Sequence, residues 1–475
     1  MHYILIALEV VLIFNLIIGV HELGHFLAAR WRGLKVERFA IWFGKPIWKK
    51  KIGGVEYALG TIPFGGYVSL PQMATMEAIE GKTDTKEPLP NVSPLDKIIV
   101  AFAGPLFSLL LAFVFALVVW QVGKPVSTSG NSTKIGWVDP NGPAAKSGLR
   151  PGDTIIEVDG HPVTQFSPAE GSKQSSSAQD SVKWCIITSQ GTNIAIKYER
   201  DGKEAMAYPV PIHKPTKWYE RRSLRQIMID SEAPALVGDT ISNSPAAKIG
   251  LRPGDQIVAV DGQKIYSYDA LLQLEEEMTN GSIHPITVTV QRDTNNFDLA
   301  LLAAKPLQPT NAPPSFGIVW QVDTNITLAH PRPLEQIQSS AETIFATFGA
   351  LFAPHGEIGV QQLGGAVMII RVYYNLFQDD DGWRRVLWFS VVLNVNLALL
   401  NMLPLPVLDG GHITLSLIEV VRRRPVSARI LEKIQSGFAA LLIAFMLYIA
   451  FFDAGDWVRS AHADRDVPIV FSPQK

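Results

Sequence analysis

The chain has 475 residues, of which 47% are hydrophobic and 18% charged, with a net charge of −2 and a mean hydropathy of +0.15. This composition is too apolar for an ordinary soluble protein and too polar for one that lies entirely in a membrane, so it indicates membrane spans joined to soluble modules. The nearly balanced charge argues against a nucleic-acid partner. The single cysteine, Cys185, excludes an intramolecular disulfide and a thiolate zinc cluster.

Four stretches are apolar enough to cross the roughly 30 Å of hydrocarbon that takes about 20 helical residues. They are residues 3–29, 97–122, 383–405 and 434–452. The first lacks the cationic start and the cleavage site of a signal peptide, so we expect it to be retained. Basic residues gather after the first span and between the third and fourth, which predicts that both of these loops are cytoplasmic. Both termini and the segment between spans two and three then lie outside, in the periplasm of a bacterium.

The region that follows the first span, residues 34–72, carries β-branched and aromatic residues between glycine turns, which predicts strands. The region is also apolar. Non-helical backbone at membrane depth needs protein or a water-filled cavity beside it, so we expect a β-hairpin that folds back against the spans. The alternative is a cytoplasmic hairpin that only stabilises the domain.

The segment between spans two and three contains an internal repeat. The stretch GPAAKSGLRPGDTIIEVDG ends at Gly160, and SPAAKIGLRPGDQIVAVDG ends at Gly262. In each copy a short Ala-rich helix ends at a glycine, RPGD provides a turn, and an apolar strand follows. The repeat therefore predicts two small mixed α/β modules of the same type.

The polar residues at the end of the first span carry the chemical signal. The stretch HELGH, residues 21–25, fits the pattern H-E-x-x-H. Residues i and i+4 of a helix share one face, so His21 and His25 are predicted to bind one zinc ion and Glu22 to reach a water on it. The alternative is that these histidines only form hydrogen bonds, but ionisable groups in a membrane helix are rare and usually functional.

A third protein ligand is predicted at the end of the third span, where NMLPLPVLDGGH runs from Asn401 to His412. At 1.5 Å per residue, His21 lies roughly 25 Å into the first span and Asp409 a similar distance beyond the start of the third, so both are expected near the cytoplasmic side. Without this match in depth, LDGG is typical of an ordinary turn. His412 is excluded because a fourth protein ligand would close a site that needs an open position. Asn396 and Asn401 hold either substrate or a neighbouring helix.

These motifs together resemble the site-2 protease family of intramembrane zinc metalloproteases. The resemblance rests on HELGH, the hairpin, AGP at residues 103–105, the tandem repeat and NMLPLPVLDGG, and it covers nearly the whole chain. It implies a multi-pass α-helical membrane protein of four spans, with a membrane-reentrant β-hairpin and two tandem periplasmic PDZ domains. It also implies His21, His25 and Asp409 as zinc ligands and Glu22 as the catalytic base. Family asparagines that hold substrate map onto Asn396 and Asn401.

The resemblance and the hydropathy pattern together imply a domain order along the chain. The expected parts are the first span with HExxH (1–33), the β-hairpin (34–72), a cytoplasmic loop (73–96), the second span (97–122), PDZ domain 1 (123–218), PDZ domain 2 (219–307), a linker with membrane-surface helices (308–382), the third span with LDGG (383–411), a cytoplasmic loop (412–433), the fourth span (434–452) and a periplasmic tail (453–475).

The implied reaction is hydrolysis of a peptide bond within the transmembrane segment of a single-span protein whose periplasmic domain has already been trimmed. Zinc lowers the pKa of a bound water to about 7, so Glu22 takes its proton and the hydroxide attacks the peptide carbonyl. By resemblance, the substrates are an anti-sigma factor of an envelope stress response and remnant signal peptides, at the bacterial inner membrane. The PDZ pair would bind trimmed C-termini or exclude bulky ectodomains.

Two other functions compete with this interpretation. A non-catalytic, membrane-anchored PDZ scaffold explains the repeat but leaves Glu22 without a role. A metal transporter would need support from an inverted repeat of spans, which the sequence lacks. The chain also departs from the family pattern at Ser108, where an Asn is usual, and at Trp42, where a glycine is usual. These departures concern substrate handling and leave the zinc set intact.

Overall fold

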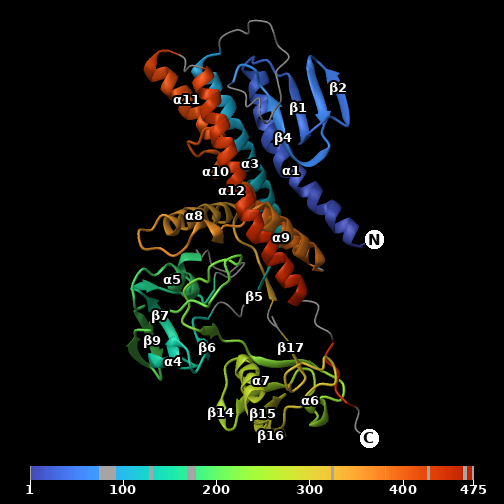
Figure 1. The fold of residues 1–475 in the computed structure, drawn as a ribbon, viewed down its shortest axis with the longest axis vertical. Helices are drawn as coiled ribbons and strands as arrows, with labels where there is room; N and C mark the ends of the chain where they lie inside the picture. Colours follow the sequence, from blue (N-terminus) through green and yellow to red (C-terminus); the bar gives the residue numbers. More distant parts are fainter. Residues whose placement is uncertain are drawn as a thin grey trace. The chain divides into compact units, whose positions relative to one another are not determined.

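The computed structural model describes residues 2–73, 92–127, 132–167, 178–321, 326–379, 381–424, 428–463 and 468–472. Most of the cytoplasmic loop predicted at 73–96 therefore lies outside the described residues. The chain forms two compact units, each assembled from segments that are distant in the sequence (Figure 1). Unit 1 contains residues 1–124, 330–345 and 363–454, and unit 2 contains residues 125–329, 346–362 and 455–475.

Among the described residues, four helices are long and apolar enough to cross a membrane. They are α1 (His2–Trp31), α3 (Pro94–Val122), α10 (Gly382–Asn401) and α12 (Ala428–Ala463). These helices agree with the four predicted spans, although α12 continues well beyond the predicted end at residue 452. The helices α1, α10 and α11 (Asp409–Arg422) all pack against α3.

Small residues allow α1 and α3 to approach closely. A Cβ atom added to Gly24 of α1 would lie 2.4 Å from the carbonyl oxygen of Ala103 in α3. Lipid tails are as apolar as leucine, so helices in a membrane associate largely through such close backbone packing. The sequence HELGH therefore supplies a packing position between its two histidines as well as the histidines themselves.

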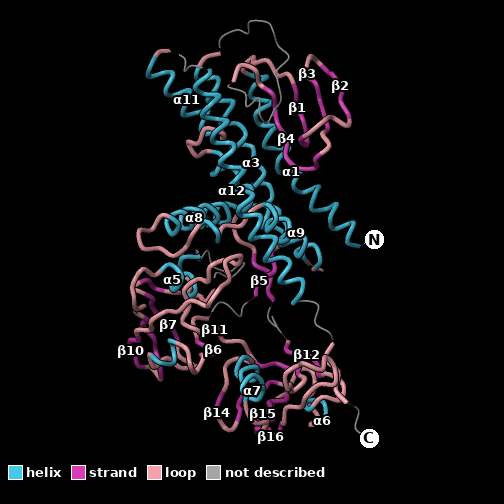
Figure 2. Tube along the Cα trace, in the orientation of Figure 1, coloured by secondary structure: helices cyan, strands magenta, loops and turns pink. Residues whose placement is uncertain are grey.

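The region predicted as a hairpin is a four-stranded sheet with the order β2-β3-β1-β4 (Figure 2). Its strands are β1 (Arg38–Phe43), β2 (Trp48–Ile52), β3 (Val55–Leu59) and β4 (Ile62–Ser69). The strands β1 and β3 pair in parallel, whereas β4 pairs antiparallel to β1. The predicted strand character is correct, but the sheet has four strands and is not a simple hairpin. Strand β3 lies on one side of β1 and β4 on the other. The edge strand β4 packs against α1.

Besides the four apolar helices and those of the two repeated modules, the described residues form three further α-helices. They are α8 (Pro333–Leu351), α9 (Ala366–Gln378) and α11, the last of which occupies residues that were predicted as a loop at 412–433. The hydroxyl of Tyr373 in α9, a fully buried residue, lies 2.9 Å from that of Ser390 in α10. This contact joins α9 to the third span.

Unit 2 contains two modules with the same order of elements. The first consists of β6 (Ile135–Val138), α4 (Pro143–Lys146), β7 (Thr154–Val158), β8 (His161–Pro162), η2 (Ala178–Asp180), α5 (Val182–Thr188), β9 (Ile196–Arg200), β10 (Lys203–Ala207) and β11 (Ile229–Ser231). The second consists of β12 (Ala235–Thr240), α6 (Pro245–Lys248), β13 (Gln256–Val260), β14 (Gln263–Lys264), α7 (Asp269–Asn280), β15 (Ile286–Arg292), β16 (Asn295–Leu301) and β17 (Ile318–Trp320). Two further strands, β5 (Lys124–Ser127) and β18 (Ile326–Ala329), pair with each other. Each module has its own cluster of buried apolar residues.

The repeat extends to a buried ion pair that the sequence motif only half contains. Asp153 of the first RPGD turn accepts hydrogen bonds from Arg200, at 2.6 and 2.7 Å, and Arg200 also donates to the carbonyl of Gly148. In the second module, Asp255 and Arg292 make the same contacts with the same lengths. The arginine of each module comes from the end of its second long strand and fastens that strand to the RPGD turn.

The tail of the chain is part of unit 2. Val470 pairs with Gln308, the amide of Leu307 donates to the carbonyl of Val470 at 2.7 Å, and Phe471 is only 3% exposed. A Cβ added to Gly317 would lie 2.9 Å from the Phe471 ring, so the ring packs on the second module. The structure therefore gives the tail a packing role that the sequence does not indicate.

The Asp255–Arg292 pair makes module stability depend on pH. Hydrogen bonds from Arg292 hold the pKa of the Asp255 carboxyl below its ordinary value of 3.8. Because the folded-state pKa is the lower one, this stabilisation is complete above the ordinary pKa and is lost as the pH falls through the folded-state pKa. Asp255→Asn should lower the unfolding temperature at about pH 6, and its difference from the wild type should narrow towards about pH 3. Tryptophan fluorescence of the detergent-purified chain measures the unfolding temperatures of the variant and the wild type at each pH.

The matched control for this prediction is Glu276→Gln, which removes an exposed carboxylate from α7 of the same module. This variant should unfold with the wild type at every pH. A difference for Asp255→Asn that is the same at both ends of the pH range would contradict the prediction.

Candidate metal centre

Three predicted ligands from two distant parts of the sequence meet in unit 1. The Nε2 atoms of His21 and His25, one turn apart on α1, are 3.2 Å from each other. Asp409, the first residue of α11, places Oδ2 at 3.2 Å from His21 Nε2 and Oδ1 at 3.3 Å from His25 Nε2. The site thus contains one potential ligand atom from each of three residues that the sequence predicted.

The spacing of these three residues fits a zinc ion. Zinc bonds of about 2.0–2.1 Å in tetrahedral geometry place neighbouring ligand atoms roughly 3.3 Å apart. Both histidines are buried, and Asp409 Oδ2 is buried without a hydrogen bond from the described residues. An unsatisfied carboxylate oxygen is costly in such surroundings, and a cation would satisfy it. Asp409 was predicted in a turn, whereas the structure places it at a helix start.

Each histidine is oriented through its other ring nitrogen. His25 Nδ1 lies 2.8 Å from the carbonyl oxygen of Val100, which can only accept, so the proton is on Nδ1 and Nε2 is free for a metal. His21 Nδ1 lies 2.9 Å from the hydroxyl of Ser108, which is fully buried. The sequence indicated Ser108 only as a departure from the family pattern. Its position against His21 depends on α3 and is visible only in the structure.

Glycines make room for this arrangement. A Cβ on Gly104 of α3, within the AGP motif, would lie 2.2 Å from His25 Nε2 and 2.8 Å from His21 Nε2. Cβ atoms on Gly410 and Gly411 would lie 2.3 and 2.1 Å from backbone carbonyl oxygens of Met402 and Leu405. The LDGG glycines therefore allow α11 to begin directly against the end of α10, which brings Asp409 to the histidines.

A cavity of about 350 Å³ opens beside the three ligands. Glu22 lines it, and the backbone of Val68 on the edge strand β4 hydrogen-bonds to Glu22. Asn401, one of the two asparagines predicted to hold substrate or a neighbouring helix, also lines the cavity. Asn396 is not among the lining residues, and its buried Oδ1 has no hydrogen bond from the described residues. His412 also lines the cavity, but it is not one of the three residues whose ligand atoms converge.

Trp42, the second departure from the family pattern, occupies a bulge in β1. Its φ of 71° lies in the left-handed region, where a glycine is favoured and a bulky side chain is strained. The indole Nε1 donates to Oδ1 of Asn15 on α1 at 2.5 Å. The next residue, Phe43, lines the cavity and stacks on Tyr67 of β4 with ring centroids 6.0 Å apart. The bond to Asn15 thus fixes the sheet to the helix that carries His21.

Residues 9–445 match the sequence profile of peptidase family M50. A protein of Neisseria meningitidis is 27% identical over 95% of this chain and 98% of its own length. A protein of Pasteurella multocida is 28% identical over 93% of this chain and 97% of its own length, and one of Treponema pallidum is 28% identical over 92% and 96%. All three are named as zinc metalloproteases. A PDZ domain of an SdrC-like protein from Listeria monocytogenes matches 20% of this chain and 93% of its own at 16% identity, with a TM-score of 0.16, too low to define a fold.

The contact at Gly104 predicts that Gly104→Ala disrupts metal binding. Alanine stabilises a helix by about 1 kcal/mol relative to glycine, so any loss would come from displacement of the histidines. Changes in the groups that orient zinc ligands cost about 10–100-fold in affinity, and we expect a loss of at least that size. Metal analysis of the purified protein and competition with a chelator measure it.

Gly19→Ala is the matched control, because a Cβ there, two residues before His21 on α1, would meet no atom within 4 Å. This variant should keep the zinc content of the wild type. Equal zinc affinity of Gly104→Ala and the wild type would show that the site is not arranged as described.

Proposed function

The chain belongs to peptidase family M50, the site-2 protease family of zinc metalloproteases, and from this premise we propose that it cuts peptide bonds within the transmembrane segments of single-span membrane proteins. The observation that carries the proposal is the convergence of His21, His25 and Asp409 beside Glu22. Two of these ligands and Glu22 belong to a helix apolar enough to cross a membrane, which supports cleavage at membrane depth.

Glu22 is the residue proposed to move the proton. A bound zinc ion held by the two histidines and Asp409 would acidify a water and polarise the peptide carbonyl. Glu22 lies in the same cavity and is not one of the three ligands, so its carboxylate is free to take a proton from the attacking water and give it to the leaving amine. Asn401 lines the cavity, and its side-chain amide would hold the substrate backbone.

The edge strand beside the cavity supports an unwound substrate. A helix with its side chains is about 10–12 Å across, and its carbonyls are already hydrogen-bonded, whereas an extended chain presents them. The strand β4 is an edge of its sheet and contributes Gly66, Tyr67 and Val68 to the cavity wall. An extended substrate segment would pair with this edge as an added strand, which places its carbonyls beside Glu22.

The wider setting follows from charge and from the repeat. Basic residues after the first span and between the third and fourth support a cytoplasmic location for both loops, with the two modules and both termini in the periplasm. In a bacterial inner membrane the modules would act as PDZ domains that bind trimmed C-termini or exclude untrimmed substrates. An anti-sigma factor of an envelope stress response and remnant signal peptides are the proposed substrates.

The alternative, a non-catalytic scaffold, would leave Glu22 without a role. We therefore expect Glu22→Gln to abolish cleavage of a tagged single-span substrate that has been trimmed of its outer domain, with zinc content unchanged, because the ligands remain. Removal of zinc with a chelator should abolish cleavage by the wild type. Cleavage is measured by gel in detergent and zinc by elemental analysis.

Glu9→Gln is the matched control, since Glu9 is exposed on the same helix and does not line the cavity. It should cleave like the wild type. Full activity of Glu22→Gln would rule out Glu22 as the base. Zinc without cleavage by the wild type would favour the scaffold.

A further inference from the structure

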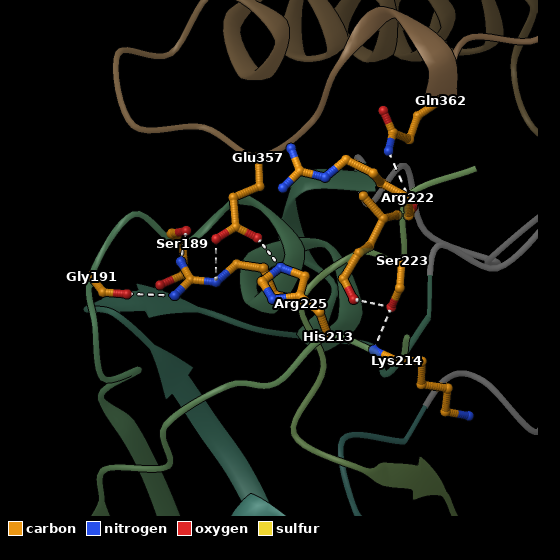
Figure 3. Close-up of polar contacts among 10 residues, drawn as sticks. Ser189, Gly191, His213, Lys214, Arg222, Ser223, Arg225, Glu357 and Gln362 are labelled. Carbon is orange, nitrogen blue, oxygen red and sulfur yellow. Dashed lines mark hydrogen bonds and ion pairs between the residues drawn. The ribbon is translucent and has the colours of Figure 1, made fainter. Parts of the chain in front are cut away.

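One corner of the first module holds a buried arginine against a loop from elsewhere in unit 2. Figure 3 shows Arg225 and His213 on either side of Glu357, which belongs to the loop of residues 352–362 between α8 and α9, here called the α8–α9 loop. His213 Nε2 lies 2.5 Å from Glu357 Oε2. Arg225 Nε lies 3.8 Å from Glu357 Oε1.

The guanidinium of Arg225 is held by two backbone carbonyls, but its Nε–H is unpaired among the described residues. It is 7% exposed and donates to the carbonyl oxygens of Ser189 and Gly191, which follow α5. Its Nε is buried and donates no hydrogen bond to any described residue, because the Glu357 carboxylate is too distant. A buried charged donor without an acceptor is costly, so a carboxylate that came closer would bind it well.

The second module has an equivalent corner. Helix α4 donates from Ala144 to the carbonyl of Ile227, and helix α6 donates from Ala246 to the carbonyl of Phe316. The residue that follows has a positive φ in both modules, 62° at Met228 and 71° at Gly317. Residues 225–228 and 314–317 therefore occupy the same place in the two modules.

This second corner also holds a glutamate carboxylate. Glu275 of α7 accepts a hydrogen bond from the amide of Phe316 at 2.6 Å and one from the hydroxyl of Ser315 at 2.9 Å. Burial raises the pKa of Glu275, while these two hydrogen bonds act in the opposite direction. A glutamate carboxylate therefore lies beside the segment that leads into the last strand of each module. Glu275 binds the backbone of that segment, whereas Glu357 contacts the side chain of Arg225. Backbone amides and cations in such turns are suited to the C-terminal carboxylate of a peptide.

We propose that Arg225 and His213 form a binding site for the C-terminal carboxylate of a peptide, and that Glu357 fills this site until such a peptide displaces it and frees the α8–α9 loop. The inference refines the proposed capture of peptide ends. It does not depend on the zinc site, and its test reads binding and not proteolysis, so the two proposals fail separately.

Of the two carboxylates, Glu357 at the first module is the one that can leave its site. Glu357 is 36% exposed and comes from a loop, and His213 is 48% exposed. Glu275 belongs to the module that it fills and sits on a regular helix. Beside the first corner, Ile212 pairs with Gln226, and the segment that leads to it exposes Tyr208 and Val210 as well as Ile212. These side chains offer apolar contact to the end of a peptide.

The test uses the full-length chain in detergent and a fluorescein-labelled octapeptide of alanine and serine that ends in leucine. Fluorescence anisotropy compares the peptide with a free carboxylate and the same peptide with a C-terminal amide. Glu357→Ala removes the internal competitor, so the free-carboxylate peptide should bind at least about tenfold more tightly than to the wild type. The amidated peptide should show no gain. The double variant His213→Asn, Glu357→Ala should lose much of the gain in affinity for the free-carboxylate peptide.

Glu204→Ala is the matched control, because Glu204 is an exposed, ion-paired glutamate on another strand of the same module. It should bind the peptide like the wild type. No gain for Glu357→Ala, or an equal gain for the amidated peptide, would overturn the proposal.

A second measurement needs no substitution. Hydrogen–deuterium exchange of residues 352–362 in the wild type should rise when the free-carboxylate peptide is added at saturating concentration. The amidated peptide should leave it unchanged. Exchange that stays the same with both peptides would show that Glu357 is a structural contact and would overturn the displacement.

Discussion

The candidate metal centre depends on how closely backbones approach one another. Gly24 allows α1 to lie against α3, Gly104 leaves the space that the two imidazoles occupy, and Gly410 allows α11 to begin against the end of α10. Interiors are packed too densely to absorb even one added methyl group at such contacts without displacement. The positions of the histidines and of Asp409 are therefore set by groups that carry no chemistry themselves.

Around the cavity, one helix carries several of the functional groups. The helix that carries His21 and His25 also carries Glu22, and it holds the sheet through the bond between Asn15 and Trp42. The edge strand β4 consequently has a fixed position relative to Glu22. In the proposed reaction, Glu22 and the strand that would align the substrate therefore keep a fixed spacing.

Unit 2 shows a different use of charge. The two Asp–Arg pairs are satisfied, repeated and internal to each module, which is typical of structural ion pairs. The corner at Arg225 is not satisfied, because its Nε lacks an acceptor and its carboxylate partner comes from a loop. Buried polar groups are normally paired, so the unpaired Nε distinguishes this corner from the two structural ion pairs and supports the proposed role in binding.

The sequence alone determined the number of apolar spans, the two modules and the HELGH motif, because hydrophobic length, repetition and the i, i+4 spacing of ligands are local properties of a chain. Asp409 was predicted from the matching depth of two spans and from the family resemblance, and its contact with the histidines is a feature of the tertiary structure. Tertiary structure decided the four-stranded sheet, the helix at 409–422, the contact of Ser108 with His21 and the carboxylates at both module corners. The sheet and the side-chain contacts join residues that are not neighbours in the sequence, and residue type does not reveal which backbone or side chain will be the partner. The helix at 409–422 is local, but it begins where Gly410 and Gly411 can pack against backbone carbonyls. Asn396 shows the same limit, since the sequence assigned it the same role as Asn401, whereas only Asn401 lines the cavity.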